Sequence, residues 1–117
     1  MGKKESPVET YLTERVEALG GTCEKFVTPG KVGPPDRIIS WKHGLTGIID
    51  FAETKSKDGV LESWQERDHK RRRAMGFLVV VLWDEAGVDE YIRCYCPPNV
   101  VSGIRRIWDP HRWYKRH

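Results

Sequence analysis

Three charged residues occupy positions where the core of a β-sheet gains nothing from charge. Asp36 opens one apolar run, and Glu53 and Lys55 lie two residues apart at the end of the next. Two carboxylates could hold a hard divalent cation through oxygen, and the cation would acidify a bound water. An ammonium beside them could orient that water or offset charge on a phosphorus under attack. These residue types therefore indicate phosphodiester hydrolysis, provided that the fold brings them together.

Each of these residues also has an ordinary structural interpretation. Asp36 could cap a turn after Pro34 and Pro35, and Glu53 with Lys55 could form a surface ion pair worth under about 1 kcal/mol. If the two carboxylates do meet, mutual repulsion should raise the pKa of at least one of them, and metal binding should reverse that rise.

A predicted β-hairpin would bring the three charged residues together. Residues 37–41 and 47–55 are strand-like, and the short connection between them has hairpin length. Side chains alternate along a strand, so Glu53 and Lys55 share one face. Antiparallel pairing sets the start of the first strand opposite the end of the second. We therefore expect Asp36, Glu53 and Lys55 to converge at one edge of the sheet.

Helix and strand signals elsewhere predict a mixed sheet with helices on its faces. Two Ser-x-x-Glu starts and two glycine stops frame helices over residues 7–19 and 63–75. Strand patterns cover residues 22–27, 77–83 and 88–95, a turn is expected over 84–87, and a short helix over 99–107. The order helix, strand, strand, strand, helix, strand, strand is a mixed α/β (α+β) class, with the second helix as a right-handed crossover.

Length and composition predict one domain over residues 1–117, with a core over about 6–95 and a basic, aromatic extension over about 99–117. No apolar run approaches the roughly 18 residues that a membrane helix needs, and the start of the sequence has no apolar segment typical of a signal peptide. The three cysteines favour a reducing cytosol over a disulfide framework. We therefore expect a cytoplasmic protein with no membrane partner.

The basic residues are unevenly distributed, although the net charge is only +3. Residues 70–73 form a basic block, which is a solvated helix face on charge alone and a phosphate-tracking face if the chain binds DNA. In the C-terminal tail, Trp108, Trp113 and Tyr114 could stack on bases or cover the core or a partner subunit. A zinc site would draw on Cys94, Cys96 and either His111 or His117, but a single Cys-x-Cys pair is a weak signal.

The motif residues resemble a known family. Pro35-Asp36 followed by Glu53-Thr54-Lys55 is similar to the signature of the PD-(D/E)XK nuclease superfamily, and over about residues 6–83 the chain resembles the VRR-NUC nucleases more closely. The matching residues are Glu9, Lys25 or Lys31, Gly33-Pro34-Pro35-Asp36, Glu53-Thr54-Lys55 and Gln65. The resemblance implies a restriction-endonuclease-like sheet, and Mg²⁺ as cofactor with Mn²⁺ as a substitute. No small-molecule organic cofactor is expected.

The resemblance also implies roles for individual residues. Asp36, Glu53 and the backbone carbonyl of Thr54 would be metal ligands, Lys55 the catalytic lysine, and Gln65 would order the site or the nearby backbone phosphate. Glu9 would reach the metal region directly or through water, and it also completes a helix capping box, a role compatible with the first. Residues placed as nucleic-acid contacts are Lys25, Lys31, His69, Arg72 and Arg73. The lysines could equally be solvated loop residues, and His69 could be a half-buried core histidine.

Two functions are consistent with these features. The first is an Mg²⁺-dependent DNA endonuclease. Small stand-alone members of the resembled family look phage-like and are associated with paired subunits and branched DNA such as four-way junctions, which implies a homodimer in a bacterial or phage-infected cell. The alternative is a module that binds branched or duplex DNA without cutting it. Basic charge and aromatics fit that alternative, but the carboxylates would then repel phosphate without a cation.

Overall fold

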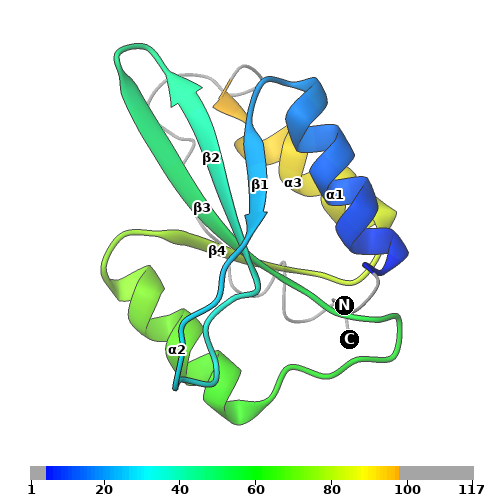
Figure 1. Cartoon of the computed structure of the whole chain (residues 1–117), viewed down its shortest axis with the longest axis vertical. Coiled ribbons are helices and arrows are strands. Elements are labelled where there is room, and N and C mark those ends of the chain that lie inside the picture. The colour runs from blue at the N-terminus through cyan, green and yellow to red at the C-terminus, as the bar shows by residue number, and fades with distance from the viewer. Residues whose placement is uncertain (1–4, 98–117) are drawn as a thin grey trace.

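The structure, a computed structural model, describes residues 5–97. Its elements are α1 (Pro7–Ala18), β1 (Thr22–Lys25), β2 (Arg37–His43), β3 (Thr46–Thr54), α2 (Ser63–Ala74), β4 (Leu78–Leu82) and α3 (Glu85–Tyr95). The strands form one sheet in the order β1-β2-β3-β4, with α1 and α3 together on one side and α2 at the other (Figure 1). This is the predicted mixed sheet flanked by helices. The extension over 99–117, with its expected short helix and aromatic residues, lies outside the described residues.

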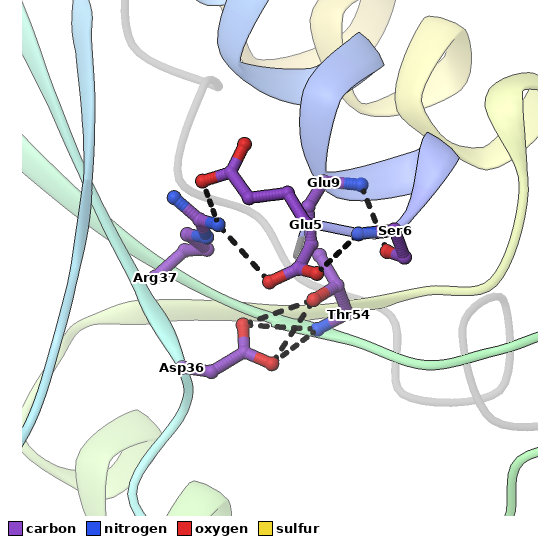
Figure 2. Close-up of polar contacts among 6 residues, drawn as sticks. All are labelled: Glu5, Ser6, Glu9, Asp36, Arg37 and Thr54. Atoms are coloured by element: carbon purple, nitrogen blue, oxygen red, sulfur yellow. Dashed lines mark hydrogen bonds and ion pairs between the residues drawn. The ribbon is translucent and has the colours of Figure 1, made fainter. Parts of the chain in front are cut away.

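Helix α1 begins with the capping box that the sequence predicts. The Ser6 amide donates to Oε1 of Glu9 at 2.8 Å, and the Glu9 amide donates to Oγ of Ser6 at 3.3 Å. Val8, Leu12 and Val16 recur on one face of the helix and are buried in the core. Glu9 is thereby fixed in the first turn of α1, which faces the start of β2 (Figure 2).

The sheet pairs its strands as expected. β2 and β3 form an antiparallel hairpin in which Arg37 is opposite Ala52, and β3 pairs in parallel with β4. α2 is therefore the crossover between parallel strands. Between the sheet and the α1 and α3 helices, Trp41 donates to the Tyr91 hydroxyl at 2.9 Å and that hydroxyl donates to Asp50 at 2.7 Å.

The strand predicted over 88–95 is wrong: residues 85–95 form α3. Asp84 caps this helix, because its side chain accepts a hydrogen bond from the Gly87 amide at 2.8 Å. Val88, Tyr91, Ile92 and Tyr95 are buried at helical spacing, as a helix on the sheet requires. β4 consequently lies at the border of the described sheet. The Arg73 guanidinium donates to its Val79 carbonyl at 2.8 Å.

The start of α2 also differs from the prediction. Glu62, not Ser63, is the residue before the first turn, and the side chain of Gln65 reaches back to the Glu62 amide at 2.9 Å. The Ser63–Glu66 pair is therefore not the capping box. Among residues 5–97, no helix is both long and apolar enough to cross a membrane.

Candidate active site

The predicted catalytic residues lie at one end of two interior strands. Arg37 pairs with Ala52, so Asp36 precedes β2 beside Glu53, close to the end of β3. Lys55 follows directly, and its amide donates to the Leu82 carbonyl at 2.9 Å. The charged residues therefore gather at the end of the central strands and not at a lateral edge of the sheet.

Asp36 is held against the end of β3 by Thr54. The Thr54 amide lies 3.2 and 3.3 Å from the two carboxylate oxygens of Asp36, and the Thr54 hydroxyl lies 3.2 and 3.0 Å from them (Figure 2). Burial raises the pKa of Asp36 to about 6 although these hydrogen bonds oppose the rise, and the negative charge of Glu9 adds to it. The carboxyl is thus oriented, and near pH 6 it is only partly ionised.

Glu53, Gln65 and Lys55 form one connected group. Lys55 Nζ donates to Gln65 Oε1 at 2.7 Å, and Gln65 Nε2 donates to Glu53 Oε2 at 3.0 Å. Lys55 Nζ also lies 3.7 Å from Glu53 Oε2. Burial, and after it the charge of Asp36, raises the pKa of Glu53 to about 8. The predicted rise in a carboxyl pKa is therefore present, but desolvation causes more of it than mutual repulsion does.

Arg37 is a component of the site that the sequence analysis missed. Its side chain is 3% exposed, and Nη2 donates to Glu5 Oε2 at 2.7 Å and to Glu9 Oε2 at 3.0 Å (Figure 2). These contacts tie the start of α1 to the start of β2, next to Asp36. A signal was present, because Arg37 alternates with Ile39 and Trp41 on the core face of β2, and a charge there requires partners.

The carboxyl oxygens of this site form an incomplete set of ligands for a hard divalent cation. Among residues 5–97, no three Asp, Glu, His or Cys side chains are grouped as a complete ion site. However, Glu53 Oε1 is buried with no hydrogen-bond partner, and a cation shared with Asp36 would satisfy it and lower both carboxyl pKa values. Glu9 already accepts hydrogen bonds from Ser6 and Arg37, so its role as a metal ligand stays a prediction, as does that of the Thr54 carbonyl.

A pH effect on stability follows from the raised pKa of Glu53. In the folded chain this pKa is about 8, above the ordinary 4.5, so the stability it contributes is complete below pH 4.5 and disappears as the pH rises through 8. Two other groups with shifted pKa values change the free energy of unfolding mainly below pH 6.5. They are His69, whose pKa is lowered from 6.5 to about 4, and Asp36, whose pKa is about 6. Between pH 6.5 and 8 in EDTA, we expect the free energy of unfolding to fall by about 1.5 kcal/mol.

Urea denaturation of the wild type and of Glu53→Gln measures this effect. The variant keeps the size of the side chain but cannot ionise, so its stability should stay level over the same pH range. Mg²⁺ should restore the wild type at pH 8 and leave the variant unchanged. Equal pH dependence of the two proteins would show that Glu53 does not carry the effect.

The residues predicted to contact DNA differ in their exposure and in their contacts within the domain. Lys25 and Lys31 are exposed. His69 is fully buried, burial lowers its pKa to about 4, and neither ring nitrogen has a hydrogen-bond partner in the described structure. These observations favour the core-histidine alternative over a DNA contact. Arg72 lies over the rings of Phe26 and Phe51, at 5.2 and 5.0 Å from their centroids.

The arginines of the basic block form hydrogen bonds and ion pairs within the domain. Arg72 Nε donates to Asp68 at 2.6 Å, and Arg73 donates to the Val79 carbonyl. The roles of both residues as DNA contacts stay predictions. Arg71 remains more than half exposed, although it also pairs with Asp68. The histidines of the weak zinc hypothesis lie outside residues 5–97, so that hypothesis stays untested.

Comparisons with known proteins identify two similar proteins. No family model matches the chain. "Putative nuclease p44" of Acyrthosiphon pisum secondary endosymbiont phage 1 is 37% identical over 79 residues, which cover 68% of this chain and 82% of that protein. A solved structure described as "VRR_NUC domain" superposes with a TM-score of 0.70 at 35% identity, covering 80% of this chain and 99% of that one.

These similarities, together with the mixed sheet and the Asp36, Glu53 and Lys55 arrangement, define a protein of the nuclease class. The chain belongs to the VRR-NUC family. The family resemblance inferred from the motif residues is confirmed.

Proposed function

We propose that the chain is an Mg²⁺-dependent endonuclease that hydrolyses phosphodiester bonds of DNA. The single observation that supports this best is the buried Oε1 of Glu53, which has no hydrogen-bond partner. Oε2 of the same carboxyl group accepts from Gln65, which in turn accepts from Lys55, and the charge of Asp36 contributes to the raised pKa of Glu53. A buried carboxyl oxygen without a hydrogen-bond partner is unfavourable in a folded domain, and a cation that replaces the proton of Glu53 would relieve it.

In the proposed mechanism, Asp36, Glu53 and the Thr54 carbonyl would hold the ion. When bound, Mg²⁺ polarises a phosphate oxygen and lowers the pKa of a coordinated water. Thr54 orients Asp36 through its amide and hydroxyl. Lys55 supplies a positive charge and a donor for the attacking water or a phosphate oxygen.

Gln65 fixes the separation of Glu53 and Lys55. Its carbonyl oxygen accepts from Lys55 and its amide nitrogen donates to Glu53, so neither side chain can rotate without losing a hydrogen bond. We expect Gln65→Leu to lower kcat for DNA cleavage by about tenfold to a hundredfold with a smaller change in KM, because Lys55 loses its orientation. Steady-state cleavage kinetics measure this. A matched variant is Glu66→Leu, an exposed neighbour that should retain wild-type kcat; equal rates for Gln65→Leu and the wild type would contradict the role.

We further propose a homodimer that acts on branched DNA. Symmetric cutting of two strands requires two sites, and two-fold pairing of one chain is the simplest way to provide them. The test combines a supercoiled plasmid and a labelled four-way junction with Mg²⁺, Mn²⁺ or EDTA, and measures mass in solution by light scattering. Product only with Mg²⁺ or Mn²⁺ supports the nuclease, and tight junction binding with no metal-dependent product would favour the non-cleaving module.

A further inference from the structure

A cavity of about 390 Å³ adjoins Lys55 where the chain enters α1 and α3. Its walls come from three segments: the start of α1, the residues that follow β3, and the junction of β4 with α3. The proposed hydrolytic chemistry uses only Lys55 among its lining residues. The volume lies in the range of small-molecule sites, so the cavity can receive a group of the size of a nucleotide.

The cavity lining combines basic, acidic and apolar residues. Lys57 is an exposed ammonium that follows Lys55, whereas Asp84 and Glu85 bring carboxylates from the start of α3. Pro7 supplies exposed apolar surface, and the largely buried Trp83 also lines the cavity. The indole N–H of Trp83 donates to the Gly59 carbonyl at 2.8 Å, which holds the ring in place. A nucleotide carries a group complementary to each of these, namely an anionic phosphate, apolar ring faces and amino donors on the base edge.

We propose that this cavity binds the nucleotide next to the scissile phosphate with its base unpaired. The inference rests on the proposed nuclease function, since it places the scissile phosphate at Lys55. Lys57 pairs with the adjoining phosphate, the base lies against Pro7 and Trp83, and the carboxylates accept from its amino group. A base inside a duplex is stacked and paired, so it must leave the stack to enter, and that step is easiest at a branch point. Binding in this cavity would therefore favour branched DNA over regular duplex DNA.

The carboxylates also imply a preference among bases. Adenine, cytosine and guanine carry exocyclic amino groups that donate to a carboxylate, whereas thymine has carbonyl oxygens in their place. Asp84 Oδ1 accepts from the Gly87 amide, so the position of this carboxylate is fixed by the helix that it caps. A base with an amino group should therefore be bound more tightly than thymine, and a sugar phosphate without a base more weakly than either.

The test is a nuclear magnetic resonance titration of the full ¹⁵N-labelled chain in EDTA with dAMP, dTMP and deoxyribose 5-phosphate. We expect dAMP to shift the Trp83 indole signal and the Lys57 and Glu85 amides, and to bind about tenfold more tightly than deoxyribose 5-phosphate. Lys57→Gln should weaken all three ligands. Lys42→Gln, an exposed lysine near the distant hairpin turn, should weaken none. Glu85→Gln combined with Asp84→Asn, which keeps a helix cap, should remove the advantage of dAMP over dTMP.

Equal affinities for dAMP and deoxyribose 5-phosphate, or dAMP shifts that are insensitive to Lys57→Gln, would overturn the proposal. The titration contains no divalent metal and measures no cleavage. Its failure is therefore distinguishable from failure of the nuclease function, which the plasmid and junction assay tests separately.

Discussion

Replacing Lys55 by methionine should lower the rate of DNA cleavage by about a hundredfold to a thousandfold. The substitution keeps the length and apolar stem of the side chain but removes the ammonium that Gln65 holds at 2.7 Å. The chain then has no donor at this position for the attacking water or the phosphate, while Asp36 and Glu53 remain. Single-turnover cleavage of a labelled junction, with enzyme in excess, measures the loss in the chemical step.

The matched control for this prediction is Lys42→Met, which removes the same charge from an exposed position near the hairpin turn. It should cleave like the wild type. Junction affinity in Ca²⁺ should fall little in Lys55→Met, since one phosphate contact among several is lost. Wild-type cleavage by Lys55→Met would place the chemistry elsewhere in the chain.

The second large effect concerns Arg37, and it is an effect on stability. Arg37→Met leaves Glu5 and Glu9 without the guanidinium that they share and removes the link between α1 and β2. Breaking a buried ion pair by removing one partner typically costs 3–5 kcal/mol, and the partial exposure of the two glutamates moderates this. We expect the free energy of unfolding to fall by about 3 kcal/mol in urea denaturation.

Arg71→Met provides the comparison for Arg37→Met. Both arginines lie 2.7 Å from a carboxylate oxygen, but the Arg71 side chain is 58% exposed and that of Arg37 is 3% exposed. The exposed pair should contribute under about 1 kcal/mol. Adding Glu5→Gln and Glu9→Gln to Arg37→Met should recover part of the stability, because uncharged amides replace the unpaired carboxylates. Similar losses for Arg37→Met and Arg71→Met would mean that burial does not set the strength of this link.

Local signals in the sequence were sufficient for much of the fold. The Ser6 and Glu9 capping box, the β2–β3 hairpin and the α2 crossover each depend on residues that are close in the chain, so their patterns could be recognised directly. The strand predicted over residues 88–95 was wrong for a physical reason. Apolar residues over 88–95 suit a strand or a helix, and only packing against the sheet and the Asp84 cap decides for α3.

The site was predictable in composition but not in its contacts. Side-chain alternation and the hairpin were enough to expect Asp36 beside Glu53. The link from Gln65 to both Glu53 and Lys55 depends on how α2 packs beside β3, which no short segment encodes. Arg37 was missed because its partners, Glu5 and Glu9, are far away in sequence. For His69 a DNA contact and a core position both stayed open, because a histidine one turn after Gln65 can face either solvent or core, and tertiary packing buries it.

The most direct test of the account is the anomalous scattering of Mn²⁺ in a crystal of the full chain at pH 8. We expect a manganese peak between the carboxylates of Asp36 and Glu53, with Glu53 Oε1 as a ligand and no peak in crystals of Glu53→Gln. Side chains that are ordered as described here, with full manganese occupancy elsewhere and none at this position, would contradict it.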